Sequence, residues 1–289
     1  MLQMKGPFLS RGVVGLVSLG LCAGLSRPPP KLDSSLSVGI VPNPLVLKIL
    51  GRSQLEFVAD LYWVRMANMA GRAVSASECG ALLPIANLIA DLAPRFKYPY
   101  FLGGVLAPVR KGRTAEYENV EGALALMARG VVAVPDYVRL HVQKAYTELE
   151  LRHDPAAAGR TLRAASALPD APPFLAKLAA RLLAQAGQYD DARDFARAMA
   201  TSEDPQLRAD FELRLKQIDL EQVLVQVEEA ARRYAKVEGH LTTSVQELIR
   251  KGFLPREPID PFGGTIELTE RGASSSVESR RLRAHVPTE

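Results

Sequence analysis

Prolines recur along the middle of this sequence at a nearly regular interval. Pro94, Pro135, Pro169 and Pro205 follow one another at 41, 34 and 36 residues. Proline lacks an amide hydrogen and stops a helix, so each one ends a helix and turns the chain into the next. A repeat of about 34 residues is typical of stacked helix–turn–helix pairs. The spacing therefore predicts a mainly α-helical solenoid in this part of the chain.

Small residues recur in phase with these prolines. They are expected where two paired helices cross most closely, because a larger side chain would hold the backbones apart. Ten residues after each of the first three prolines comes a small residue, namely Gly104, Ala145 and Ala179. About twelve residues before each of the last three prolines comes an alanine, namely Ala123, Ala157 and Ala192. The long interval is explained by a polar insertion, RKGRTAEYENVEG, between the helices of one pair. The pattern favours paired helices over a generic helical bundle, which remains the alternative.

One segment carries the pattern most clearly. GQYDDARDFARAM, residues 187–199, combines a turn glycine, an aromatic residue and an alanine at the expected helix crossing. Together with the repeat spacing, it resembles the tetratricopeptide repeat family, over residues 58–216. The resemblance implies a TPR-like solenoid of helical hairpins within residues 55–216. Such solenoids bind peptides or helices of partner proteins in a groove formed by the first helix of each pair.

The resemblance also implies which side chains lie near this groove. They are Tyr98, Phe101, Arg139, Val142, Tyr146 and Glu150. This mixture of aromatic, cationic and acidic side chains suits a protein interface. The alternative for Tyr98 and Phe101 is that they fill the core of the solenoid.

The C-terminal part predicts a long helix joined to a small α+β cap over residues 217–280. The long helix begins near Pro205 and ends at Gly239. Ser244 and Glu247 form a capping-box pattern that opens a short helix, and alternating residues from Ile266 predict a β-hairpin.

The sequence IDPFGG lies between the short helix and the hairpin. We interpret Asp260, Pro261, Phe262, Gly263 and Gly264 as a structural turn, in which the aspartate accepts backbone hydrogen bonds and the proline fixes the bend. The aromatic ring then packs under the long helix and the glycines adopt left-handed angles.

The order of these elements resembles the C-terminal region of the major pseudopilin of type II secretion. That family carries a long helix, a short helix, an Asp-Pro-aromatic-Gly turn and a small sheet, and here the match covers about 50 residues without a prepilin cleavage signature. The pseudopilin family binds calcium at this end, which leaves a cation site at Asp260 as the alternative to a purely structural turn.

The N-terminus predicts export. Lys5 and Arg11 precede an apolar run from Gly12 to Leu25, which is short for a comfortable membrane crossing and fits a secretory signal. Within residues 1–31 we therefore expect a cleaved signal peptide, an uncleaved membrane anchor, or a lipid anchor at Cys22. Each alternative puts the remaining chain in the periplasm, free or anchored to the membrane. Residues 32–54 read as a linker, and residues 281–289 as a disordered tail.

Composition and motifs give no sign of catalysis or of a cofactor. The four histidines are scattered without metal-ligand spacing, so we expect no metal site, and no phosphate-binding loop or nucleophile motif is present. The net charge of +4 lies partly in the two ends, so nucleic acid is not an expected partner. We therefore expect a non-enzymatic scaffold or adaptor of the bacterial cell envelope that binds other proteins. The alternative is a component of a secretion or type IV pilus-like machine that uses its C-terminal cap for assembly.

Overall fold

The computed structural model describes residues 41–51, 54–73, 75–278 and 281–282. All of them belong to one compact unit, Ile40–Glu289. The expected signal or anchor at residues 1–31, its lipidation site Cys22 and the first part of the 32–54 linker lie outside the described residues. Within the described part the chain is mainly helical, as predicted, with small antiparallel sheets.

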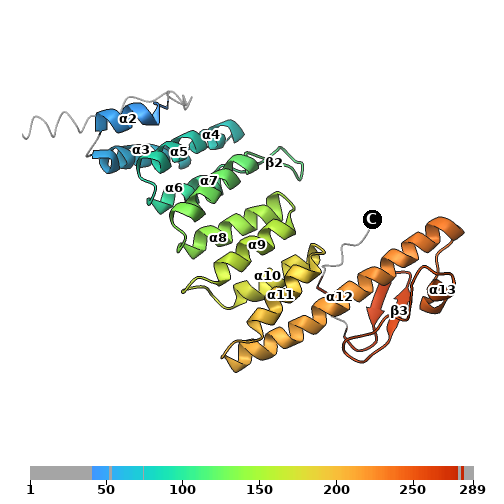
Figure 1. Ribbon diagram of the computed structural model, residues 1–289. Helices are drawn as coiled ribbons and strands as arrows, with labels where there is room; N and C mark the ends of the chain where they lie inside the picture. The colour runs from blue at the N-terminus through green and yellow to red at the C-terminus, as the bar shows by residue number, and fades with distance from the viewer. Residues whose placement is uncertain (1–40, 52–53, 74, 279–280, 283–289) are drawn as a thin grey trace, which may run out of the picture. The chain divides into compact units, whose positions relative to one another are not determined.

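Consecutive helices from α5 to α12 pack against one another in sequence order (Figure 1). Helices two apart in this order are also in contact, as α6 is with α8 and α10 is with α12. The first helices are α2 (Pro44–Gly51), α3 (Leu55–Ala70), α4 (Ala76–Gly80), α5 (Leu82–Leu92) and α6 (Lys97–Leu106). They are followed by α7 (Val120–Ala133), α8 (Val138–Tyr146), the π-helix η2 (Thr147–Leu151), α9 (Pro155–Ser166), α10 (Phe174–Gln185) and α11 (Tyr189–Met199). The last helices are α12 (Pro205–Glu238) and α13 (Val245–Arg250), and the strands are β1 (Val109–Arg110), β2 (Tyr117–Glu118), β3 (Ile266–Thr269) and β4 (Gly272–Ser275).

The repeat prolines lie where the spacing predicted turns. Pro94, Pro135 and Pro169 fall in the connections before α6, α8 and α10, and Pro205 is the first residue of α12. Asp204 caps α12, because its carboxylate accepts a hydrogen bond from the Gln206 amide at 2.9 Å.

The small residues expected at helix crossings are all buried. Gly104, Ala145, Ala179, Ala123, Ala157 and Ala192 line the contacts between neighbouring helices. A β-carbon added at Gly104 would lie 2.5 Å from Cγ of Met127 on α7. Small residues therefore permit the close approach that the pattern predicted.

Two segments differ from the expectations. The polar insertion forms the antiparallel hairpin β1–β2, which its charged sequence did not predict. The expected linker contains helix α2, since Pro44 at the first helical position and the apolar residues that follow it are compatible with a helix.

Helix α12 crosses the predicted boundary between residues 216 and 217 without a break. Its first half packs with α10 and α11 around Phe211 and Ile218. Its second half packs with α13 and the β3–β4 hairpin around Leu224, Val227 and Tyr234. One helix therefore belongs to two hydrophobic cores, and no flexible connection separates repeats from cap.

The tail predicted to be disordered at residues 281–289 is ordered at its start. Leu282 is buried in the core around Phe211, and its carbonyl accepts hydrogen bonds from Arg181 and Gln185 on α10. Arg281 contacts Glu221 at 2.8 Å and Glu228 at 2.8 Å. The prediction was wrong for these two residues because the buried carboxylate of Glu221, 1% exposed, requires a cationic partner.

Burial opposes the positive charge of Arg281. Its hydrogen bonds to Glu221 and Glu228 outweigh this effect and raise the pKa of the guanidinium above its usual value. Arg281 therefore stays charged and holds the C-terminal segment against the middle of α12.

Substitution of Gly130 by alanine tests the close packing of α7. The added β-carbon would lie 2.7 Å from Cβ of Tyr100 and 2.6 Å from Cδ2 of Leu140. Overpacking outweighs the gain in helix propensity, so we expect Gly130→Ala to lower the free energy of unfolding by about 2 kcal/mol. Urea denaturation measures this change.

Gly122→Ala on the same helix is the matched control. Its new β-carbon would meet only the far end of the Leu83 side chain, which can move aside. This variant should be neutral or slightly stabilising, and equal effects of the two substitutions would contradict the packing described here.

Substitution of Arg281 by alanine tests the anchoring of the C-terminal segment. The variant leaves the buried Glu221 carboxylate without its cation, which should lower the free energy of unfolding by about 3 kcal/mol. Arg271→Ala, at an exposed arginine in the turn of the β3–β4 hairpin, should change it by less than about 0.5 kcal/mol. Equal urea midpoints for the two variants would rule out the anchoring role.

Candidate protein-binding site

The six side chains predicted to line a groove lie on three neighbouring elements. Tyr98 and Phe101 belong to α6, Arg139, Val142 and Tyr146 to α8, and Glu150 to η2. All are exposed except Phe101, which is half-buried. Arg139, Val142, Tyr146 and Glu150 are spaced by three and four residues, so they form one stripe along α8 and its continuation.

A cation–aromatic contact joins the two helices at this surface. The Arg139 guanidinium carbon lies 5.3 Å from the centre of the Phe101 ring. Phe101 also lies 6.3 Å, centre to centre, from the ring of Tyr137. An exposed cation–aromatic contact such as that of Arg139 with Phe101 stabilises a surface by about 0.5–1 kcal/mol. The stripes of α6 and α8 therefore form one continuous face, which we call the α6–α8 face.

The alternative that Tyr98 and Phe101 fill the core is wrong for Tyr98, whose side chain is 50% exposed. Its neighbour Tyr100 occupies the core instead at 1% exposure. The Tyr100 hydroxyl donates a hydrogen bond to the carbonyl of Pro94 at 3.0 Å. Tyr98 is thereby left on the exposed side of the same helix.

Sequence reasoning missed four further members of this surface. Trp63 and Phe96 pack at 5.3 Å between ring centres, and Lys97 lies 4.9 Å from the ring centre of Tyr137. Phe96 and Tyr137 each follow a repeat proline by two residues, which is a sequence signal that could have identified both.

Phe96, Lys97 and Tyr137 border a cleft of about 640 Å³ at the N-terminal ends of α6 and α8. Its walls are the segments Arg95–Tyr98 and Ala133–Tyr137. The cleft combines aromatic rings with the cations of Arg95 and Lys97. Aromatic and arginine side chains are the types enriched at protein interfaces.

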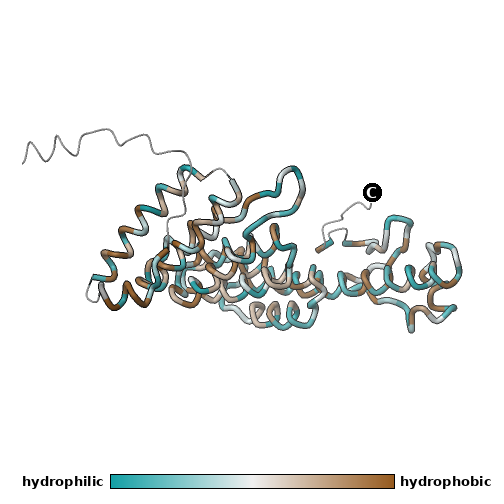
Figure 2. The backbone as a smooth tube through the Cα atoms, turned by 90° about the horizontal axis from the view of Figure 1, so that it is seen from above, coloured by the Kyte–Doolittle hydropathy of each residue, from teal (hydrophilic) through white to brown (hydrophobic). Residues whose placement is uncertain are grey.

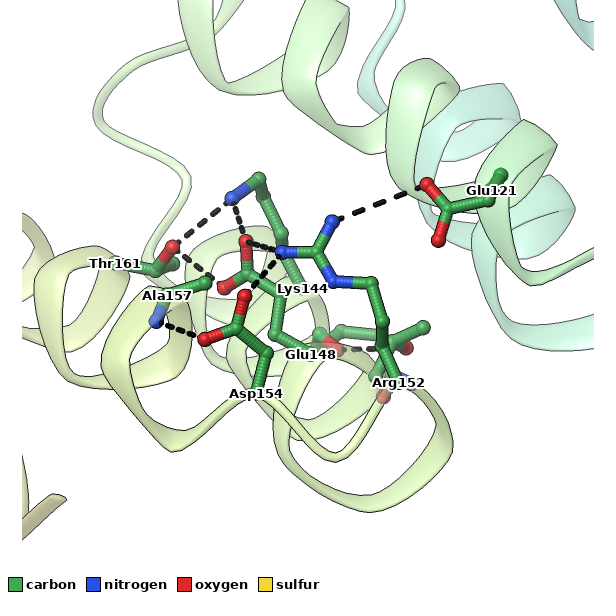
Figure 3. A network of polar contacts seen from close by, with 9 residues as sticks. Glu121, Lys144, Glu148, Arg152, Asp154, Ala157 and Thr161 are labelled. Atoms are coloured by element: carbon green, nitrogen blue, oxygen red, sulfur yellow. Dashed lines mark hydrogen bonds and ion pairs between the residues drawn. The ribbon is translucent and has the colours of Figure 1, made fainter. Parts of the chain in front are cut away.

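A buried polar network supports α8 and η2 (Figure 3). The carboxylate of Glu148, buried on η2, accepts a hydrogen bond from the Thr161 hydroxyl at 2.7 Å and contacts the Lys144 ammonium. Arg152 lies 4.0 Å from the same carboxylate and 3.8 Å from Glu121 on α7. Both oxygens of Glu148 have partners, so the network reads as structural, and it fixes the element that carries Glu150.

Asp154 continues this network at the start of α9. Its carboxylate accepts a hydrogen bond from the Ala157 amide at 2.8 Å and one from Arg152 at 3.0 Å. The backbone hydrogen bond, together with the nearby arginine charge, lowers the pKa of the Asp154 carboxyl. The carboxylate thus caps α9 and ties it to η2.

The five residues of the predicted turn lie together in the cap. The buried carboxylate of Asp260 accepts a hydrogen bond from the Phe262 amide at 2.8 Å and one from the Ser275 hydroxyl at 2.5 Å. Phe262 packs on the core beneath α12. Gly263 has a φ of 82°. Pro261 lies between Asp260 and Phe262, the residue whose amide donates to the Asp260 carboxylate.

Gly264 differs from the expectation, because it does not adopt a left-handed angle. It is required by close approach instead, since a β-carbon there would lie 2.7 Å from the Asp260 carboxylate. Hydrogen bonds occupy both oxygens of that carboxylate. Within the part of the chain that the structure describes, no cluster of three or more acidic, histidine or cysteine side chains could hold a metal ion.

The described helices include none that combines the length and the hydropathy of a membrane-spanning segment. The chain matches no model of a known protein family, no curated protein and no solved structure.

Proposed function

We propose that this chain is a non-enzymatic scaffold that binds partner proteins through the α6–α8 face. The observation that carries the proposal is the stack of Arg139 on Phe101, set among the exposed side chains of Tyr98, Val142 and Tyr146. These side chains are held by a rigid helical support, so binding a partner costs little ordering of the surface.

In this proposal the helices form a TPR-like solenoid. Its four hairpins are α3 with α5, α6 with α7, α8 with α9, and α10 with α11, and each pair is in contact. The α6–α8 face then belongs to the groove formed by the first helices of successive pairs. The apolar run at residues 12–25 supports export to the bacterial cell envelope, with envelope proteins as partners.

Substitution of two exposed side chains tests whether the α6–α8 face binds partner proteins. We expect the double variant Arg139→Glu and Tyr146→Ala to lower the amount of co-purified partner protein by about tenfold or more, because both side chains are of types that dominate interface energies. The full chain is purified from envelope fractions of its native cells, and its partners are quantified by mass spectrometry.

Arg197→Glu, an equal charge change on α11, is the control and should leave the partners unchanged. Recovery of the same partners in the same amounts with the α6–α8 double variant would contradict the proposal. Recovery of the chain only from the cytoplasm would contradict the envelope location.

A component of a secretion or pilus-like machine is the second candidate function. What favours it is the arrangement of the cap, in which the second half of α12 packs on the β3–β4 hairpin and the Asp260 turn. In this candidate the exposed apolar side chains of the cap, such as Ile259 and Val277, contact the assembly.

Charged residues at these two positions test the second candidate without removing part of α12. We expect Ile259→Asp with Val277→Asp to abolish assembly or secretion in native cells while leaving the urea midpoint within the range of surface variants. Normal assembly with this folded double variant would exclude the second candidate.

A further inference from the structure

Helix α3 is apolar on two opposite sides. One side packs on α5 through Ala59, Met66 and Met69, which are buried. On the opposite side Phe57, Leu61 and Val64 are 59%, 56% and 57% exposed. An amphipathic surface helix normally has one apolar side, which faces the core, so the second apolar side of α3 is a surface without a partner among the described residues.

The exposed residues of α3 have the spacing of a helix-packing seam. Phe57, Leu61 and Val64 are separated by four and three residues, which places them in one row along the helix. Helix α2, which contacts α3, also exposes Leu45, Val46 and Ile49. Figure 2 shows hydrophobic residues, in brown, on these first helices at the left of the view.

An acidic edge runs beside this seam. Glu56 and Asp60 each precede a seam residue by one position, so they lie about 100° around the helix from it. Both are exposed and border a cleft of about 450 Å³ with the segment Leu92–Phe96. Among the described residues, neither carboxylate has an ion-pair or hydrogen-bond partner.

We propose that the outer side of α3 docks an amphipathic helix of a partner protein. The apolar stripe of that helix lies on Phe57, Leu61 and Val64, and a lysine or arginine at its edge reaches Glu56 and Asp60. This surface borders the α6–α8 face, because the clefts beside the two share Arg95 and Phe96. Its seam residues Phe57, Leu61 and Val64 are not part of that face, so the inference does not rest on the function proposed for it.

The acidic edge decides between possible occupants. An anionic bilayer surface attracts basic segments, and two carboxylates beside the seam oppose it. An antiparallel pair of copies would bring the acidic edge of one α3 against that of the other, and like charges that face each other across an interface are destabilising. A basic amphipathic helix can pack its apolar stripe on the seam and also pair its cations with the acidic edge.

Two synthetic helical peptides test this inference. Both carry the same apolar stripe, but one has lysines along its edges and the other has glutamates. Binding to the full chain is followed by fluorescence anisotropy of the labelled peptides. We expect the lysine peptide to bind about tenfold more tightly, because two surface charge pairs change from repulsive to attractive.

Three variants of the chain sharpen the result. Glu56→Lys with Asp60→Lys should reverse the preference between the peptides, and Leu61→Asp should abolish binding of both. Asp191→Lys with Asp194→Lys changes the net charge equally on α11 and should leave the preference unchanged.

Four outcomes would overturn the inference. They are equal affinity for the two peptides, binding of neither, a dimer in light scattering that Leu61→Asp dissolves, and flotation with vesicles of phosphatidylethanolamine and phosphatidylglycerol that Leu61→Asp prevents. The last two would assign the seam to a second copy or to a bilayer.

Discussion

Helix α12 is the element on which the C-terminal half of the described unit depends. Over its 34 residues it contributes Phe211 and Ile218 to one core and Leu224, Val227 and Tyr234 to another. The buried Glu221 lies between these two sets, and Arg281 neutralises it from the far end of the chain. Because one stiff helix runs through both cores, it holds them next to each other.

The same logic of close helix packing produces the surface proposed to bind proteins. Buried small residues such as Ala145 and Ala179 bring neighbouring helices together, and this leaves the opposite sides of α6 and α8 facing solvent. Arg139 then reaches across to Phe101, while Glu148 and its partners hold η2 from behind. The scaffold therefore presents side chains that need little reorganisation to bind.

The sequence predicted those features that depend on local pattern. Proline spacing, with small residues in phase with it, predicted the helices of the middle of the chain, and Gly239 and Ser244 predicted the end of α12 and the start of α13. The turn at Asp260 followed from its composition.

Features that depend on distant contacts could not be predicted in this way. The ordered Arg281 depends on a carboxylate 60 residues away, so its own neighbours in sequence looked disordered. Of the candidate site, the six side chains were named from repeat geometry, whereas Trp63 joins it only through a contact with Tyr98 that is distant in sequence. The sequence did not reveal that the outer side of α3 is exposed, because the apolar residues of its two sides together produced an ordinary helical pattern.

Site-specific photo-crosslinking in native cells tests the central claim, that the α6–α8 face binds partner proteins. A photoreactive residue replaces Val142 on α8, and separately the exposed Val132 on α7 as a control. We expect discrete crosslinks to another protein from position 142 that Arg139→Glu removes, and none of these from position 132. The same crosslinks from both positions, or none from position 142, would contradict it.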